Sequence, residues 1–495
     1  MEVDRDDEFA PVKNAPGAAT DSPDTARALL SNQAIRWLTA VGAEIVKPPK
    51  TDFEMDFCTD CEISPLVSYA GEGLTLFKGL RMPLPLYLME GQPRQNGRSA
   101  HKDDLLEAVS GHPAPNKEMK YGTAGFRDEW NILHAIFVRM GIVAVLRSRS
   151  SSGRCVGVMT TASHNPEKDN GIKIVDTDGS MLAQEWEPIA EAIATLSHPA
   201  EVIAFITSQE ARLGCMDRRQ PATVIVGRDT RPHSRELVDC VCAGVRAMGG
   251  TVLDLGEVTT PQLHFVVQAT NGAGWSRLDD FNPTEALSHY YTTLMTGYVT
   301  LRQTSAYAGI AHVVVDGAFG VGGISITEFV KVLSSFWGRH TEFNRCALSV
   351  DLRNAVGAGS VNKDCGAEIV QKGRRPPCNF HATEDMGKLM CSYDGDADRI
   401  VFQSFIPTPS GPQWVLFDGD KIASLVSAFL IEEMRAAGLC EGSAPCVMGV
   451  VQTAYANGAS TAFLRSRGID ITFTKTGVKY LHHAARRCVD DRGDK

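Results

Sequence analysis

The chain lacks any long apolar segment: its 495 residues contain no run of about 18 apolar residues, the length that a membrane-spanning helix requires. It also lacks a basic excess, because 59 acidic residues outnumber 49 basic ones and the formal net charge is −10. This charge argues against a general polyanion binder, whereas a small phosphorylated ligand needs only local positive charge. We expect neither a nucleic acid nor a membrane as partner, and the sequence indicates no partner protein.

A disulfide framework is the second absence. The 13 cysteines are odd in number and scattered along the chain, which fits a reducing compartment. The N-terminal residues are acidic, unlike a secretory signal or a transit peptide. We therefore expect a cytoplasmic protein. Cys58 and Cys61 could begin a zinc site, but no second pair follows at a suitable spacing, so we assign no zinc there.

The texture of the sequence changes near residue 105. Residues 1–104 begin with a polar, proline-rich stretch and are expected to form a partly disordered N-terminal extension. Further on, short apolar runs such as Val224–Val226 alternate with helical patterns, which predicts an α/β fold with ligand-binding groups at its strand ends. Ser234 and Asp420 are expected to cap helices, the second of which runs from Lys421 to about residue 437.

The segment Thr161–Pro166 (TASHNP) places a serine beside a histidine after one of the apolar runs. A phosphorylated serine can donate its phosphoryl group when the reacting oxygens are positioned and the charge is neutralised. His164 and Lys173 are basic groups close to Ser163 in sequence that could stabilise the phosphate or move a substrate proton. Taken alone, however, the segment is more simply interpreted as a turn with local side-chain-to-backbone bonds.

The segment Asp394–Arg399 (DGDADR) carries three carboxylates at alternate positions. Such carboxylates can converge on one hard cation, and three ligands that leave room for a phosphate oxygen and water suit Mg²⁺. It is not an EF-hand, because the sixth position is Arg399 rather than glycine and the twelfth is Phe405 rather than glutamate. An acidic surface turn is disfavoured because an apolar run follows directly. Arg399 also offers a fork of donors to phosphate oxygens.

Two glycine-containing turns give weaker signals. Tyr121–Arg127 (YGTAGFR) permits a close backbone approach and ends in an arginine that can meet a phosphate. Thr474–Lys479 (TKTGVK) offers hydroxyls, backbone N–H groups and an ammonium. Phe417–Lys421 also contains Asp-Gly-Asp, but capping explains its carboxylates and we assign it no metal. Gly317–Gly323 lacks the spacing of a dinucleotide-binding loop and is interpreted as structural.

Together these segments resemble the α-D-phosphohexomutase superfamily, and within it the phosphoacetylglucosamine mutases. The similarity covers about three quarters of the chain, roughly residues 112–484. Thr161–Pro166 and Asp394–Arg399 are motifs of the whole superfamily. Three further motifs separate the N-acetylglucosamine mutases from the phosphoglucomutases and phosphomannomutases. They are Tyr121–Arg127, Val451–Gly458 and Thr474–Lys479.

The resemblance implies a role for each matching residue. Ser163 would be the phosphorylated serine, and its phosphate would complete a Mg²⁺ site formed by three aspartates. Lys173 would take part in proton transfer, with His164 and Arg127 supporting the phosphate. The implied metal ligands besides Ser163 are Asp394, Asp396 and Asp398. The implied substrate contacts are Arg399, Thr476, Gly477 and Lys479.

The resemblance also implies an activity and a fold. Such enzymes interconvert N-acetylglucosamine 6-phosphate and 1-phosphate through a sugar bisphosphate, which is both intermediate and activator, and the product feeds UDP-N-acetylglucosamine synthesis. The family fold has four α/β domains around one deep cleft. We therefore expect a multidomain α/β protein with mixed sheets, divided into a phosphoserine domain, a metal-loop domain and a sugar-binding domain. The expected ranges are 105–215, 216–403 and 404–495.

One departure from the family pattern concerns the end of the chain. Neither the Glu-Ala-Asn-Gly-His-type loop that reads the sugar nor the Arg-x-Ser-Gly-Thr-type loop that grips the second phosphate is found. We therefore expect a C-terminally truncated chain with an incomplete third domain, no fourth domain, exposed apolar surface and little activity of its own. The alternatives are another phosphohexomutase, acting on glucose or mannose phosphates, and a non-catalytic sugar-phosphate-binding paralogue. Intact Ser163 argues against the paralogue, while the missing loops favour it.

Overall fold

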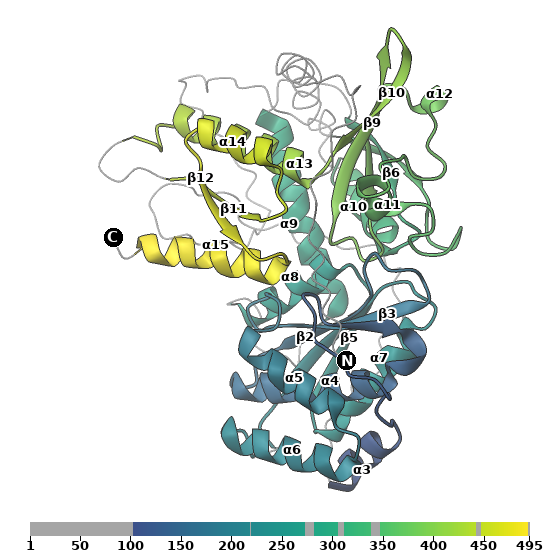
Figure 1. The fold of residues 1–495 in the computed structure, drawn as a ribbon, viewed down its shortest axis with the longest axis vertical. Helices are drawn as coiled ribbons and strands as arrows, with labels where there is room; N and C mark the ends of the chain where they lie inside the picture. Colours follow the sequence, from purple (N-terminus) through teal and green to yellow (C-terminus); the bar gives the residue numbers. More distant parts are fainter. Residues whose placement is uncertain are drawn as a thin grey trace, which may run out of the picture.

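The computed structural model describes residues 102–217, 219–272, 282–304, 311–337, 347–441 and 447–493. The expectations for residues 1–101, including the Cys58–Cys61 pair, lie outside these described residues. Figure 1 shows three units that follow one another along the chain, coloured blue to teal, teal to green, and yellow-green to yellow. The first described helix, α3, already begins at Lys102 and packs in the first unit, so this unit starts before residue 105.

The first unit is a five-stranded mixed sheet in the order β1-β3-β2-β4-β5. β2, β4 and β5 are parallel, whereas β3 runs antiparallel to both of its neighbours. The strands are β1 (Phe126–Glu129), β2 (Val156–Thr160), β3 (Asp169–Val175), β4 (Thr223–Arg228) and β5 (Thr251–Glu257). The helices are α3 (Lys102–Ser110), η2 (Trp130–Ile132), α4 (His134–Ser150), η3 (Gln184–Trp186), α5 (Glu187–Thr195), α6 (Pro199–Arg212), α7 (Ser234–Ala247) and α8 (Thr260–Asn271).

Helices cover both faces of this sheet, because successive residues of each strand point to opposite sides. Val158 of β2 belongs to the core beneath α4 and α7, and the next residue, Met159, belongs to the core beneath α8. All five residues of β2 are buried, as the apolar run in the sequence predicts. The serine segment therefore leaves the end of a strand that is fixed from both sides.

The second unit is another five-stranded mixed sheet, in the order β10-β9-β8-β6-β7. β7, β6 and β8 are parallel, and β8, β9 and β10 are joined antiparallel. The strands are β6 (Ala311–Asp316), β7 (Leu348–Arg353), β8 (Met390–Tyr393), β9 (Ile400–Thr408) and β10 (Gly411–Phe417). The helices are α9 (Pro283–Thr304), α10 (Val321–Trp337), α11 (Gly366–Gln371) and α12 (Ala382–Asp385).

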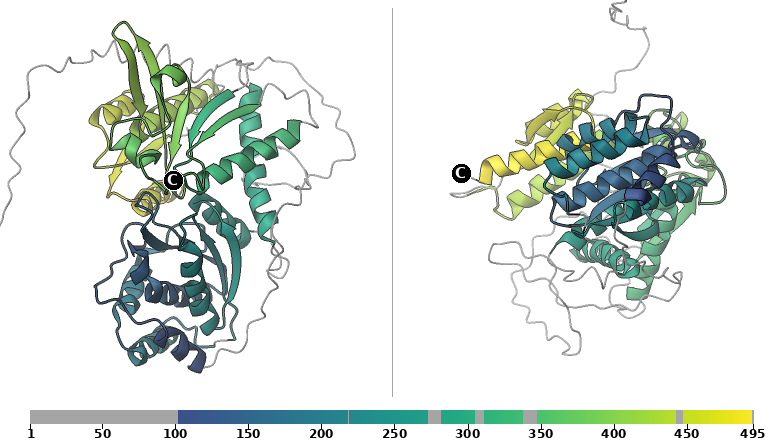
Figure 2. Two further views of the ribbon diagram at one scale, coloured as in Figure 1. Left: turned by 90° about the vertical axis from the view of Figure 1, so that its right-hand side faces the viewer. Right: turned by 90° about the horizontal axis from the view of Figure 1, so that it is seen from below.

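The third unit is smaller, with two parallel strands, β11 (Gly449–Thr453) and β12 (Asp470–Thr474). Its helices are α13 (Gly419–Ala436), α14 (Gly458–Ser466) and α15 (Val478–Gly493). In Figures 1 and 2 this yellow unit lies beside the green second unit, with α15 turned toward the first. None of the helices in the described ranges is both long enough and apolar enough to span a bilayer.

The structure confirms an α/β fold with mixed sheets and corrects several boundaries. The divisions expected at residues 215 and 403 both fall inside a sheet, because β4 and β5 complete the first sheet and residue 403 lies within β9. Local composition did not reveal these strand pairings. Ser234 begins α7 but does not cap it, since its hydroxyl donates to Asp229. Asp418, rather than Asp420, caps α13.

Candidate active site

The serine segment follows β2 and meets the aspartate segment of the second unit. Ser163 is only 2% exposed, and its Oγ donates a hydrogen bond to Asp394 Oδ2 at 2.7 Å. Ser163 has a φ of +53°, a left-handed conformation that is uncommon outside glycine. Its backbone N–H donates to Thr161 Oγ1 at 2.9 Å. The two segments are 231 residues apart in sequence, so their contact is a feature of the tertiary fold.

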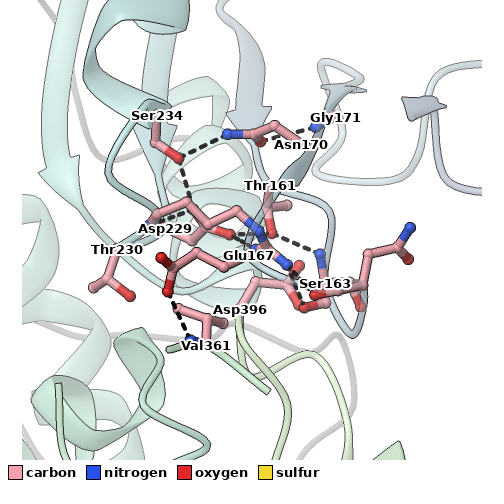
Figure 3. Close-up of polar contacts among 12 residues, drawn as sticks. Thr161, Ser163, Glu167, Asn170, Gly171, Asp229, Thr230, Ser234, Val361 and Asp396 are labelled. Carbon is pink, nitrogen blue, oxygen red and sulfur yellow. Dashed lines mark hydrogen bonds and ion pairs between the residues drawn. The ribbon is translucent and has the colours of Figure 1, made fainter. Parts of the chain in front are cut away.

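A buried polar network supports the serine segment from within the first unit (Figure 3). Asp229, which follows β4, accepts hydrogen bonds from Thr161 Oγ1 at 2.8 Å and from Ser234 Oγ at 2.7 Å. Asp229 also forms an ion pair with Arg231. Asn170 of β3 donates to Ser234 Oγ at 3.0 Å. Because β2 and β4 are parallel neighbours, their carboxyl ends bring both segments to the same edge of the sheet.

The aspartate segment connects β8 to β9. One carboxylate oxygen each of Asp394, Asp396 and Asp398 lies within 4.8 Å of the others. Asp394 and Asp396 are buried, whereas Asp398 is exposed. Gly395 is required by the close approach of the two units, because a Cβ at this position would lie 2.6 Å from Ser163 O. The three carboxylates thus converge as the alternate spacing predicts.

The donor set fits a divalent cation. Asp396 Oδ1 is buried and has no hydrogen-bond partner, which is unfavourable unless a ligand compensates it. Burial, together with repulsion from the nearby carboxylates of Asp396 and Asp398, raises the pKa of Asp394 to about 7. A cation held between the three carboxylates would offset the cost of burying their charge and would reduce the repulsion between them. Three carboxylate ligands suit Mg²⁺, a hard cation that prefers oxygen.

Lys173 of β3 lies under the same carboxylates. Its buried Nζ donates to Asp396 Oδ2 at 2.8 Å and to Asp398 Oδ2 at 3.1 Å. Burial lowers the pKa of Lys173, but attraction to these two carboxylates outweighs it and the pKa is raised. Burial likewise disfavours the ionised form of Asp396, yet Lys173 holds its pKa below the usual range. Thr260 of α8 adds a hydrogen bond to Asp396 Oδ2 at 2.6 Å.

Arg399 connects the aspartates to the serine. Its Nε donates to Asp394 Oδ2 and its Nη1 to Glu368 Oε2, each at 2.9 Å, and its Nη2 lies 3.5 Å from Ser163 Oγ. Burial opposes the charged form of Arg399, but Asp394 and Asp398 raise its pKa. The guanidinium therefore stays charged beside the serine hydroxyl, where a phosphate on Ser163 would need a cation.

Arg127 and His164 also interact electrostatically with this centre. Burial lowers the pKa of Arg127, whose Nε is buried without a hydrogen-bond partner in the described structure. Its charge acts on the three aspartates and on Arg399. Burial lowers the pKa of His164 to about 4, and Arg399 contributes to the shift. His164 is therefore neutral at pH 7, so it can support a phosphate through a hydrogen bond but not through charge.

Two of the predicted sugar contacts of the third unit lie against the first unit, and one of them, Gly477, lies beside the Tyr121–Arg127 turn. Gly477 has a φ of +128°, and a Cβ there would lie 3.1 Å from Thr123 Cγ2. The side chain of Lys479 is buried, and its Nζ pairs with Glu187 Oε1 at 2.6 Å. Thr476 is exposed. The structure thus brings this segment to the first unit, while a contact of Thr476, Gly477 or Lys479 with sugar stays a prediction.

Sequence reasoning missed several residues that hold the centre together. They are single polar residues without a recognisable local pattern, and each contacts the motifs from a distant part of the chain. The missed residues are Asp229, Arg231, Thr260, Asn362 and Glu368.

Two protein-family models match the chain. The model described as phosphoglucomutase/phosphomannomutase, alpha/beta/alpha domain I, matches residues 121–200 and 203–275. The model described as phosphoacetylglucosamine mutase AMG1, domain III, matches residues 418–490. The first range contains the serine segment and Lys173, and the second contains Thr474–Lys479.

Curated relatives and solved structures agree with these matches. Phosphoacetylglucosamine mutase of Arabidopsis thaliana is 40% identical over 77% of this chain and 66% of its own length. Aspergillus fumigatus N-acetylphosphoglucosamine mutase in complex with GlcNAc-6P and magnesium is 34% identical, with a TM-score of 0.68 over 79% of this chain and 68% of that chain. The structure of the same fungal enzyme with glucose 1,6-bisphosphate is 33% identical, with a TM-score of 0.70 over 79% and 69%.

The two mixed-sheet units, with a buried serine facing three aspartates between them, define the α-D-phosphohexomutase class, the superfamily of a solved neighbour at 33% identity and a TM-score of 0.67. Several relatives of known function match over more than two thirds of their own length. The chain belongs to the phosphoacetylglucosamine mutase family. It spans slightly less than two thirds of the first curated relatives, with 66% and 63% of their lengths covered.

Proposed function

We propose that the protein is a phosphoacetylglucosamine mutase that interconverts N-acetylglucosamine 6-phosphate and 1-phosphate. The observation that carries the proposal is the 2.7 Å contact between Ser163 Oγ and Asp394 Oδ2, which joins the two superfamily motifs in one buried centre. The names of the relatives and the GlcNAc-6P complex of the fungal enzyme support this sugar over glucose or mannose phosphates. A binding paralogue would need neither a buried serine nor the three aspartates.

The reaction would proceed by two phosphoryl transfers through Ser163. In the first, the bond between phosphorus and Ser163 Oγ breaks and a bond to a sugar hydroxyl oxygen forms, so that a sugar bisphosphate results. The sugar hydroxyl loses its proton and the serine oxygen gains one. After the bisphosphate reverses its orientation, its other phosphate returns to Ser163 and the proton movements are reversed. A bisphosphorylated sugar would also restore a serine that has lost its phosphate, which is the activator role that we assign to it.

The surrounding residues would position the groups and stabilise the charge of the transferred phosphoryl, which is most of what phosphoryl transfer requires. Asp394, Asp396 and Asp398 would hold Mg²⁺, which supplies Lewis-acid stabilisation of phosphoryl oxygens when bound. Arg399 would bind a phosphate oxygen next to Ser163, from which its Nη2 is 3.5 Å away. Lys173, held protonated by Asp396 and Asp398, would donate a proton in one direction and accept it in the other.

The phosphorylation, the fate of the product, the location and the remaining residue roles follow from the same proposal. Ser163 would make the protein a phosphoprotein, and the 1-phosphate product would feed UDP-N-acetylglucosamine synthesis. The nine free cysteines of the described residues support a reducing, cytoplasmic location. Arg127 and His164 would support the phosphate, while Thr476, Gly477 and Lys479 would contact the sugar phosphate from the third unit.

The test is ³¹P NMR of the purified chain with N-acetylglucosamine 6-phosphate, Mg²⁺ and a catalytic amount of glucose 1,6-bisphosphate. We expect the 1-phosphate to appear, with Ser163→Ala reducing the rate at least about 1,000-fold because the acceptor oxygen is lost. Ser208→Ala is the matched control, since Ser208 is exposed and bonds only within its own helix. Equal or faster turnover of glucose or mannose phosphates would refute the sugar assignment. A chain that transfers no phosphoryl group at all would refute the proposed activity.

A further inference from the structure

The backbone carbonyls of the serine segment are held by two side chains from different units. Arg231 Nη2, from the first unit, lies 3.2 Å from Ser163 O and 2.7 Å from Asn165 O. Asn362 Nδ2, from the second unit, lies 2.8 Å from Ser163 O and 3.1 Å from Asn165 O. Carbonyl oxygens can only accept, so the amide nitrogen of Asn362, and not its amide oxygen, must face them. The same two acceptors thus receive donors from both sides.

Asn362 is itself fixed by the second unit. It has a left-handed backbone with a φ of +63°, which asparagine tolerates better than most residues. Its backbone N–H donates to Ala318 O at 2.9 Å. The preceding residue, Val361, donates its N–H to Glu167 Oε2 at 3.1 Å, a second bond between the units that Figure 3 shows next to the serine segment. These bonds hold the backbone of Asn362 beside the serine segment.

The conformation of Ser163 makes this support relevant to its chemistry. A non-glycine residue in the left-handed region is strained and persists only where its surroundings hold it there. The carbonyl carbon and the Cβ of Ser163 are both bonded to its Cα. A fixed carbonyl therefore limits the directions in which Oγ can point. That oxygen is directed at Asp394 Oδ2, 2.7 Å away. Loss of a side chain that donates to this carbonyl would widen the range of Oγ positions relative to the aspartates.

We propose that Asn362 is a positioning residue for phosphoryl transfer, which holds Ser163 Oγ toward the aspartate segment by binding the carbonyls of Ser163 and Asn165. This inference rests on the proposed function of Ser163 as the phosphoryl carrier. Arg231 supplies the other half of the clamp and is anchored by Asp229 within the first unit. Asn362 and the aspartates belong to the same unit, so Asn362 couples the serine to the position of the unit that carries Asp394.

Two variants separate the side chain of Asn362 from its backbone. Asn362→Gly removes the donor but keeps the left-handed backbone favourable, and Asn362→Asp keeps the shape but turns a carboxylate oxygen toward two carbonyl oxygens. The matched control is Asn379→Gly in the same unit. Asn379 is also left-handed, with a φ of +67°, but it is exposed and its amide donates to Asn354 Oδ1 at 2.7 Å.

We expect kcat for N-acetylglucosamine 6-phosphate to fall about 10- to 100-fold in both Asn362 variants, because small misplacements of a reacting group have effects of this size. KM should change by less than about twofold, because the clamp acts on the serine and not on the sugar. Asn379→Gly should keep both constants. A native kcat in Asn362→Gly would overturn the inference, and so would a rise in KM with an unchanged kcat.

Hydrogen–deuterium exchange of the full chain gives a readout that does not depend on turnover. We expect faster exchange of the Ser163 and Asn165 amides in Asn362→Gly, confined to the serine segment, and native exchange in Asn379→Gly. If the native chain transfers no phosphoryl group, the proposed function fails while exchange still reports on the clamp. Unchanged exchange in Asn362→Gly, or faster exchange spread over the whole second unit, would refute local positioning.

Discussion

Fourteen of the 17 residues of α4 in the first unit are buried, whereas α13, the longest helix of the third unit, buries only Ser427, Ala428 and Ile431. The core of the first unit extends from α3 to α7, but the corresponding cluster of the third unit has just three buried residues, Ile431, Leu464 and Ile469. Phe473 and Val478 of the third unit are more than half exposed.

This difference in packing matches a difference in the work that each region is proposed to do. Ser163, the proposed phosphoryl carrier, follows β2, and Lys173 lies on β3; both strands are buried, which favours the accurate positioning that the chemistry needs. The predicted sugar contacts of the third unit lie instead on a segment that begins α15, and contacts with the first unit hold it in place. Catalytic precision and ligand contact are thus assigned to regions of unequal rigidity.

Matched phenylalanine truncations test this comparison most strongly. Phe137 on α4 is fully buried, so Phe137→Ala should reduce the free energy of unfolding by about 3–5 kcal/mol. Phe473 is 51% exposed and its ring lies next to the Arg465 guanidinium in a cation–π arrangement, so Phe473→Ala should lower the free energy of unfolding by less than about 1 kcal/mol. Urea denaturation followed by circular dichroism measures both. Equal losses would show that the third unit is as well packed as the first, and the comparison would fail.

The two Asp-Gly-Asp segments sharpen the comparison next. Asp398→Asn changes the exposed member of the aspartate cluster, a proposed Mg²⁺ ligand, and should weaken Mg²⁺ binding by about 100-fold, since even indirect ligand contacts contribute 10- to 100-fold. Asp420→Asn is the control at the start of α13, where the carboxylate accepts the backbone N–H of Asn457. It should leave the Mg²⁺ dissociation constant unchanged. Isothermal titration calorimetry decides, and a loss of Mg²⁺ affinity in Asp420→Asn would contradict the assignment of a single site.

Much of this site could be predicted because many of its functional residues lie in short contiguous motifs. Asp394–Asp398 and Ser163 each lie in a loop after a strand, which is where α/β folds place ligand-binding groups. The two strands belong to different sheets, so the contact between the loops depends on how the two units pack. The strand pairings that complete each sheet could not be predicted, since β4 and β5 join the first sheet after long intervening helices. Asn362 and Glu368 escaped because a single polar residue carries no pattern until the fold brings it to Ser163 or Arg399.

The capping error has a different physical cause. An Asp-Gly-Asp sequence offers two carboxylates two residues apart, and either can accept a hydrogen bond from the first turn of a helix. The backbone of Asp418 is extended, with a φ of −75° and a ψ of 177°, which lets its side chain reach the N–H of Lys421. Asp420 already lies inside the helix and bonds to Asn457 instead. Sequence alone does not distinguish these two geometries.

The junction between the third and first units should show the smallest effects. Lys479→Met removes the buried ammonium that pairs with Glu187. It should lower the free energy of unfolding by about 1–2 kcal/mol, because it leaves a carboxylate unpaired and only partly hydrated. The ion pair between Arg486 and Asp178 is a matched but exposed one, so Arg486→Met should change stability by less than about 0.5 kcal/mol.

Substrate kinetics of the same two variants then separate structure from ligand contact. If Lys479 also contacts the sugar phosphate, Lys479→Met should raise KM for N-acetylglucosamine 6-phosphate about tenfold or more, since a charge-assisted hydrogen bond contributes roughly 1.5–3 kcal/mol. Arg486→Met should leave KM unchanged, because Arg486 lies on the same helix but has no predicted ligand role. A native KM with reduced stability in Lys479→Met would confine this lysine to the junction. The third unit would then contact sugar through Thr476 and Gly477 without its only predicted cation.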